Sequence, residues 1–175
     1  MVSISNEKKI GVVGAGLIGA SWAGLFSAFG YETILYDPKK EAIDRAVSQI
    51  KGIWPSIENL HGKLENKKEI KTVDKLEELK ECSFLQENCP ENLDLKQALI
   101  SDLERIVSDE TIIASSTSSF LPSELREVCD NPDRVLVGHP MNPPHLIPLV
   151  EIVMGEVDNS EILNRVHNFY LSLHR

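Results

Sequence analysis

The segment KKIGVVGAGLIGASWAGLF, residues 8–26, constrains the fold most strongly, because it joins an apolar strand to a helix through a glycine-rich turn. Residues 14–19 read G-A-G-L-I-G. Three glycines at this spacing are weak evidence alone, since glycines cluster in many turns. Here the pattern follows a strand and opens a helix, which is the context that a dinucleotide-binding turn requires. The segment therefore predicts a strand–turn–helix unit that binds a dinucleotide.

Each glycine meets a separate physical demand. Gly14 permits the tight turn, Gly16 lets the backbone approach a pyrophosphate, and Gly19 lets the helix pack closely on the strand. The helix N-terminus then offers unpaired N–H groups to the phosphates. Asp37 ends the next apolar run, ILYD, where its carboxylate can accept the ribose hydroxyls and would repel a 2′-phosphate. The pattern indicates NAD rather than NADP; the alternative is a plain glycine turn followed by an Asp that caps a helix.

The rest of the chain alternates short apolar runs with longer amphipathic ones. The expected strands are 10–13, 33–36, 70–73, 84–86, 111–115 and 135–138, followed by 147–154. The expected helices are 17–29, 39–59, 76–80, 93–107 and 122–128, followed by one from residue 160. Alternation of this kind predicts an α/β fold of the Rossmann type: a doubly wound, mainly parallel sheet with helices on both faces. We expect residues 1–175 to form one domain.

Composition excludes several classes of function. The 175 residues carry a formal net charge of −9, which argues against nucleic acid or an anionic membrane as a partner. No segment looks like a transmembrane span or a secretory signal. The cysteines Cys82, Cys89 and Cys129 are odd in number and lack metal-ligand spacing, as is typical of free thiols in a reducing cytosol. We expect a cytoplasmic protein without a metal.

Three polar stretches follow strands at the edge of the sheet where ligands bind in such folds. They are ENCPENLDLK (87–96), SSTSSF (115–120) and HPMNPP (139–144). Because the carboxyl ends of parallel strands meet at one edge, we expect all three stretches to face the nicotinamide and its substrate.

His139 and Glu151 are the strongest candidates for a catalytic pair. His139 stands at the end of the sixth strand, and alternation in the seventh places Glu151 in an apolar row with Ile147, Leu149 and Val153. Burying that carboxylate unpaired would cost several kcal/mol, so the histidine is a natural partner. The carboxylate would fix the imidazole tautomer of a general base. The alternatives are a structural His–Glu bridge or an exposed Glu on an edge strand.

Other polar residues give weaker signals. Ser118 could hold the reacting substrate oxygen, but serines also serve in turns and helix caps, as before Pro122. His61, His167 and His174 are expected at the surface, and His145 has no evident partner.

These motifs together resemble the NAD-binding domain of the 3-hydroxyacyl-CoA dehydrogenase family, and within it the lambda-crystallin / L-gulonate 3-dehydrogenase branch. The resemblance runs through GVVGAGLIGASWA, LYD, ENCPENLDLK, SSTSSFLPSEL and GHPMNPPHLIPLVEIV, almost the whole chain. It implies catalytic roles for His139, Glu151 and Ser118. It also implies NAD contacts, beyond the glycines, at Leu17, Ile18, Asp37, Glu91, Lys96 and Asn142. Ser116, counted with these cofactor-binding positions, stands where the acyl-CoA branch typically has Asn.

The family's second, helical domain is absent from this chain, so we expect an N-terminal fragment that binds NAD but turns over poorly. The resemblance implies a homodimer for the full-length form. The preferred hypothesis is NAD-dependent oxidation of the 3-hydroxyl of a small hydroxy acid such as L-gulonate. The alternatives are a short-chain 3-hydroxyacyl-CoA (3-hydroxybutyryl-CoA) dehydrogenase, or an NAD-binding or structural module without turnover.

Overall fold

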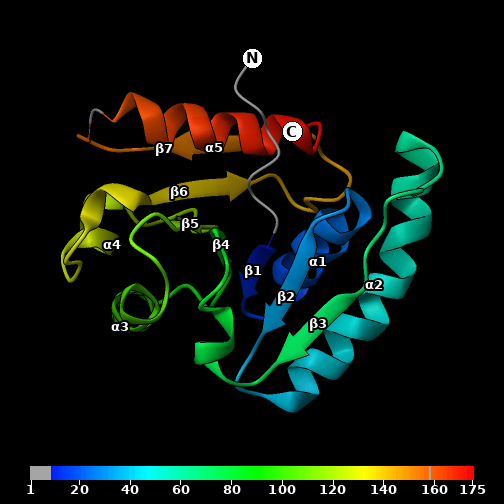
Figure 1. Ribbon diagram of the computed structural model, residues 1–175, viewed down its shortest axis with the longest axis horizontal. Helices are drawn as coiled ribbons and strands as arrows, with labels where there is room; N and C mark the ends of the chain where they lie inside the picture. Colours follow the sequence, from blue (N-terminus) through cyan, green and yellow to red (C-terminus); the bar gives the residue numbers. More distant parts are fainter. Residues whose placement is uncertain (1–8, 158) are drawn as a thin grey trace.

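Six of the apolar runs form the parallel part of a seven-stranded sheet in the computed structural model, which describes residues 9–157 and 159–175 (Figure 1). The parallel strands are β1 (Lys9–Val13), β2 (Glu32–Tyr36), β3 (Ile70–Val73), β4 (Phe84–Glu87), β5 (Ile112–Ser115) and β6 (Val135–Pro140). β7 (Val150–Val153) pairs antiparallel with β6. The order β3-β2-β1-β4-β5-β6-β7 reverses direction between β1 and β4. Ligands bind at such a switch point in open α/β sheets.

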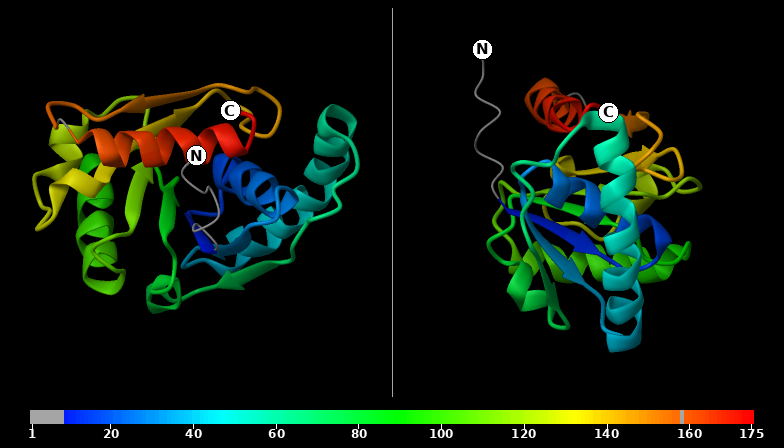
Figure 2. Two further views of the ribbon diagram at one scale, coloured as in Figure 1. Left: turned by 45° about the horizontal axis from the view of Figure 1, so that its top comes forward. Right: turned by 90° about the vertical axis from the view of Figure 1, so that its right-hand side faces the viewer.

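Helices cover both faces of this sheet. They are α1 (Leu17–Ala28), α2 (Lys40–His61), α3 (Leu93–Ile106), α4 (Pro122–Arg126) and α5 (Ser160–Ser172), with short 3₁₀ turns at Leu76–Leu79 and Pro132–Arg134. Residues of α1, α2 and α5 share one buried cluster, and residues of α3 and α4 share the other. Figure 2 shows α5 running across the sheet beside α1. The predicted doubly wound α/β architecture is confirmed.

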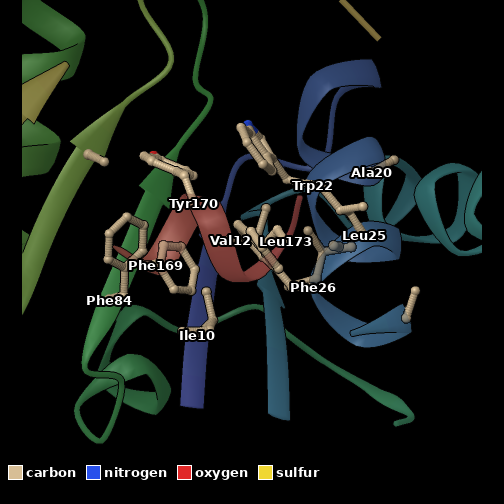
Figure 3. Close-up of a cluster of buried hydrophobic side chains, with 14 of the residues drawn as sticks. Ile10, Val12, Ala20, Trp22, Leu25, Phe26, Phe84, Phe169, Tyr170 and Leu173 are labelled. Atoms are coloured by element: carbon tan, nitrogen blue, oxygen red, sulfur yellow. The ribbon is translucent and has the colours of Figure 1, made fainter. Parts of the chain in front are cut away.

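An aromatic cluster fixes α5 on the sheet. Phe169 and Tyr170 of α5 lie between Phe84 of β4 and Trp22 of α1 (Figure 3). The rings of Phe84 and Phe169 are 4.2 Å apart between centroids, and those of Trp22 and Tyr170 are 5.7 Å apart. Val166, Phe169 and Tyr170 of α5 and its C-cap residue Leu173 are buried, whereas Leu163 is exposed.

The predicted elements agree with the structure within a few residues, with two differences. The segment 76–80 forms a 3₁₀ turn rather than an α-helix. The last strand was expected over 147–154 but begins at Val150. The residues before Val150 form a turn instead, in which Leu146 N and Ile147 N donate to the Pro143 carbonyl, and Pro148 has no N–H to donate to a ladder.

A buried amide joins four of these elements. The Gln86 side chain is fully buried; its Nε2 donates to Ser116 Oγ at 2.9 Å and to the Gly138 carbonyl at 3.1 Å. Its Oε1 accepts from Tyr170 Oη at 2.7 Å. A Cβ on Gly138 would lie 2.2 Å from that hydroxyl, so only glycine leaves room for it. Burial raises the pKa of Tyr170, and the phenol stays a donor. The network ties α5 to the ends of β4, β5 and β6.

We predict that Tyr170→Phe destabilises the protein by about 1–3 kcal/mol, because it leaves a buried amide oxygen of Gln86 without its donor. The matched control is Tyr36→Phe, which also removes a hydroxyl from a buried tyrosine but leaves the Gln86 network intact. Urea unfolding of both variants measures the difference in free energy of unfolding. Equal, small losses for the two variants would contradict this role for the network.

Candidate active site

The glycine turn after β1 has the geometry that its three predicted roles require. Gly14 has φ +96°, and a Cβ there would lie 2.8 Å from the Asn88 carbonyl oxygen. A Cβ on Gly19 would lie 1.8 Å from the carbonyl oxygen of Gly14, so the first turn of α1 packs directly on the end of β1. A Cβ on Gly16 would meet no atom within 4 Å. The open side of the turn is therefore the one that a pyrophosphate would approach.

This turn borders a cleft of about 900 Å³. Asp37 stands in its wall, where its Oδ2 accepts from Ala15 N and its Oδ1 from Lys39 N, both at 2.9 Å. Both bonds hold the carboxylate at the end of β2, where it can receive ribose hydroxyls. Leu17 also lines the cleft and is 72% exposed, whereas Ile18 packs against the buried cluster under α1. The shape of the turn and the placed carboxylate fit NAD.

A second, smaller pocket of about 210 Å³ brings together the three residues expected to be catalytic. Ser118, His139 and Glu151 all line it, together with the apolar side chains of Phe120 and Val137. His139 and Glu151 are register partners in β6 and β7, and His139 Nδ1 lies 2.9 Å from Glu151 Oε2. The pairing across the two strand ends therefore arises from the antiparallel register.

The expected burial of Glu151 is wrong. Alternation places Leu149, Glu151 and Val153 on one face as predicted, but that face is exposed, and the Glu151 side chain is 57% exposed. The reason is that β7 is an edge strand, and among the described residues α5 packs on the face to which Val150 and Ile152 belong. His139 is thus oriented by a solvent-accessible carboxylate on the open face.

Glu91 and Lys96 hold the loop that carries Ser118. Glu91 Oε1 accepts from the backbone N–H groups of Ser118 and Ser119, both at 3.1 Å, and from Thr117 Oγ1 at 2.5 Å. The Lys96 ammonium is 1% exposed and faces carboxylates instead of either pocket. The cofactor contact expected of Lys96 stays a prediction.

The remaining predicted positions lie near the same edge of the sheet. Ser116 Oγ donates to Asn88 Oδ1 at 2.7 Å and accepts from Gln86 and from Trp22, so its hydroxyl is committed within the protein. Asn142 is exposed in the loop that follows β6.

His145 has a partner that the sequence did not reveal: its Nδ1 lies 2.7 Å from Ser21 Oγ in α1. Burial and the charge of Arg175 lower the pKa of His145. His61, His167 and His174 are exposed as predicted, and His61 and His174 stack on one another.

Residues 9–175 match the family described as 3-hydroxyacyl-CoA dehydrogenase, NAD binding domain. The chain belongs to this family. NAD as the cofactor, predicted from the glycine turn and Asp37, is confirmed by that match. No helix among the described residues is both long and apolar enough to cross a membrane.

The similar proteins carry two kinds of name: L-carnitine dehydrogenase among the sequence relatives and 3-hydroxybutyryl-CoA dehydrogenase among the solved structures. An L-carnitine dehydrogenase from Oceanobacillus iheyensis is 40% identical over 168 residues, covering 95% of this chain and 55% of the relative. An L-carnitine dehydrogenase from Bacillus cereus is 38% identical over 172 residues, covering 97% and 52%. Among solved structures, 3-hydroxybutyryl-CoA dehydrogenase from Escherichia coli superposes with a TM-score of 0.86 at 26% identity, covering 97% of this chain and 37% of that one. The chain spans about half the length of the curated relatives it matches.

Sequence reasoning missed the buried polar groups beneath the pockets. Glu87, at the end of β4, is fully buried and forms an ion pair with Lys96 at 2.9 Å. Gln86 and Asn88, on either side of it, hold Ser116. The signal was present: buried parallel strands are usually apolar throughout, and three consecutive polar residues, QEN, break that pattern at a carboxyl end.

We predict that Gly16→Ala weakens NAD binding by about tenfold or more while the fold tolerates it. The new methyl group would meet no protein atom but would project into the open side of the turn. Because Gly16 is the N-cap of α1, the loss of stability should stay below about 1 kcal/mol.

The control is Gly52→Ala in α2, where a Cβ also meets nothing within 4 Å. This variant should leave the dissociation constant of NAD unchanged and raise stability by up to about 1 kcal/mol. Calorimetric titration with NAD and thermal unfolding measure both quantities. Unaltered NAD affinity in Gly16→Ala would show that the cofactor does not use this turn.

Proposed function

We propose that the protein oxidises the hydroxyl group of a small 3-hydroxy acid with NAD as the acceptor. The observation that carries this proposal is the His139–Glu151 pair, which lines one pocket with Ser118 at the sheet edge that also forms the cofactor cleft. A paired imidazole beside a hydroxyl donor is the arrangement that removal of an alcohol proton needs. When bound, NAD would accept the hydride.

Each residue of the pocket has a separate part in the proposed chemistry. Glu151 Oε2 accepts a hydrogen bond from the N–H at His139 Nδ1, so Nε2 is the nitrogen that takes the substrate's hydroxyl proton. The same carboxylate stabilises the imidazolium that forms. Ser118 donates to the substrate oxygen and holds it beside the base. Among the pocket-lining residues, Phe120 and Val137 supply apolar surface around the reacting carbon.

Binding of the cofactor is assigned to the glycine turn and to Asp37. The N–H groups at the start of α1 would hold the pyrophosphate, beside Gly16 and Leu17 in the cleft wall. The Asp37 carboxylate receives the ribose hydroxyls of adenosine and repels a 2′-phosphate, which favours NAD over NADP. Asn142, in the loop after β6, is proposed to contact the nicotinamide end.

The names of the relatives support a small hydroxy acid as the substrate. L-carnitine, from which several relatives take their names, is a 3-hydroxy acid, as the proposed L-gulonate-like substrate is. An acyl-CoA substrate is the second candidate, favoured by the structural likeness to 3-hydroxybutyryl-CoA dehydrogenase. The chain aligns with about half of the length of its relatives. We propose that a helical domain completes the site in the full-length protein, and that this form is cytoplasmic and homodimeric.

We predict that His139→Gln lowers turnover by about two to four orders of magnitude, the usual contribution of a general base. The change should leave the NAD dissociation constant nearly unaltered, because His139 is assigned to the substrate and not to the cofactor. The control is His167→Gln, which replaces an exposed histidine on α5. Full-length protein is assayed for NADH formation with L-carnitine, L-gulonate and 3-hydroxybutyryl-CoA.

Oxidation of the thioester alone would overturn the hydroxy-acid assignment in favour of the acyl-CoA one. Wild-type turnover in His139→Gln would remove His139 as the base. NAD binding without oxidation of any substrate in the panel would favour a binding or structural module.

A further inference from the structure

We propose that Ser21 and His145 are a positioning pair: their hydrogen bonds fix the loop after β6, residues 141–149, against α1. The helix assigned to the pyrophosphate would then also set the loop assigned to the nicotinamide end of the cofactor. This inference rests on the proposed function for its catalytic meaning, because Asn142 and His139 are there the residues beside the reacting groups. The geometric part stands by itself and can be tested without turnover.

Two hydrogen bonds join the loop to α1 at one hydroxyl group. The backbone N–H of His145 donates to Ser21 Oγ at 3.0 Å, and His145 Nδ1 lies 2.7 Å from the same oxygen. Ser21 is 2% exposed, so this hydroxyl is shielded from water that could replace either bond. It lies one helical turn after Leu17, which lines the cofactor cleft. The loop is therefore attached to the part of α1 that follows directly on the cofactor-binding turn.

The ionisation of His145 fits a bond in which Ser21 is the donor to the ring. Burial and the charge of Arg175 lower the pKa of His145, so its imidazole is neutral at neutral pH. A hydroxyl has one proton to donate and two lone pairs that accept. The arrangement that satisfies both groups has the Ser21 hydroxyl donating to an unprotonated Nδ1 while its oxygen accepts from the backbone N–H. One serine thus holds both the backbone and the side chain of His145.

A second side chain holds the same part of the loop from the end of α5. Arg175 Nε donates to the Pro144 carbonyl and Arg175 Nη2 donates to the His145 carbonyl, each at 3.0 Å. Arg175 is itself tied to α5, because its backbone N–H donates to the Tyr170 carbonyl at 3.0 Å. Pro144 and His145 are therefore fixed between α1 and the residues that follow α5.

Asn142 lies on the short segment between two fixed points of this loop. On one side, Met141 N donates to the Leu149 carbonyl at 3.0 Å and closes the loop at the end of the β6–β7 ladder. On the other side stands His145, bound to α1. Asn142 is exposed, so packing contributes little to its position and the two attachments decide it. The Ser21–His145 pair is thus the link through which α1 places Asn142 near the end of β6.

Ser21→Ala in this 175-residue chain tests the geometric part. Alanine is the best helix former, so α1 keeps its propensity while both bonds to His145 are lost. Nitrogen-15 spectra report on the backbone and side-chain amides of Asn142, and titration calorimetry with NAD reports on the cofactor. We expect the Asn142 resonances to shift. The NAD dissociation constant should stay within about threefold, because α1 reaches the cleft at Leu17, one turn before Ser21.

Turnover of the full-length protein tests the catalytic part, with L-carnitine, L-gulonate and 3-hydroxybutyryl-CoA as substrates. Ser21→Ala should lower kcat by about tenfold, because a small displacement of groups around the reacting atoms is costly. The KM for NAD should stay within about threefold. A general loss of folded protein would not leave altered kcat beside an unaltered fold and KM.

Two substitutions of His145 separate the hydrogen bond from packing. The side-chain oxygen of asparagine can replace Nδ1 as the acceptor for Ser21, whereas leucine has a bulky side chain without an acceptor. Both variants keep the backbone N–H. We expect His145→Asn to stay within about twofold of wild-type kcat and His145→Leu to lose about three- to tenfold. Equal losses in the two variants would overturn the role of the hydrogen bond.

The matched control is Ser27→Ala, which removes another buried hydroxyl of α1. Ser27 Oγ donates to the Lys68 carbonyl, in the segment before β3 instead of the loop after β6. This variant should leave the Asn142 resonances, the NAD dissociation constant and kcat unchanged.

Unchanged Asn142 resonances in Ser21→Ala would overturn the proposal, as would wild-type kcat in that variant. NAD affinity that falls by tenfold or more would also overturn it and make the pair a support of the cofactor-binding helix alone. If the full-length wild type oxidises none of the three substrates, the proposed function fails. Shifted Asn142 resonances with NAD affinity retained would still support the positioning of the loop, so the two failures are distinguishable.

Discussion

The contact between Gly19 and Gly14 is the constraint on which the site depends. Helix α1 starts so close to the end of β1 that any side chain at Gly19 would occupy the position of the Gly14 carbonyl. This contact places the N-terminus of α1 at the switch point between β1 and β4. From there, the wall of the cofactor cleft is built by the end of β2 on one side and by the loop after β4 on the other. The position of the cofactor cleft therefore depends on the close backbone packing at this turn.

The pocket lined by Ser118, His139 and Glu151 depends on buried polar side chains, whereas the cofactor cleft depends on backbone packing. Gln86 and Glu87 leave β4 in opposite directions: the amide bonds to Gly138 and Tyr170, and the carboxylate bonds to Lys96. Buried polar groups are stable only when their bonds are satisfied, and satisfied networks specify one arrangement. The network under β4 thus fixes the strand ends from which Ser118 and His139 project. The exposed pair His139–Glu151 needs that rigid support, because its own carboxylate is open to solvent.

Much of this could be predicted from the sequence because it follows from local patterns. The apolar runs identified the fold, and the glycine spacing identified the cofactor cleft. The alternation of side chains along β7 identified Glu151 as the partner of His139. The burial of Glu151 could not be read the same way, since parity says which residues share a face but not which face is covered. The bond between Ser21 and His145 joins residues 124 positions apart, and no local pattern indicates such a partner. The same holds for the bonds that Glu91 makes to residues 117–119, a loop brought to it only by the folded sheet.

The central claim is that the carboxyl edge of this sheet binds NAD through the glycine turn and Asp37. Calorimetric titration of the unmodified 175-residue chain with NAD and with NADP tests it most directly. The structure predicts saturable binding of NAD, with NADP at least about tenfold weaker because its 2′-phosphate would face the Asp37 carboxylate. Equal affinity for the two nucleotides, or no binding of NAD at all, would contradict the account.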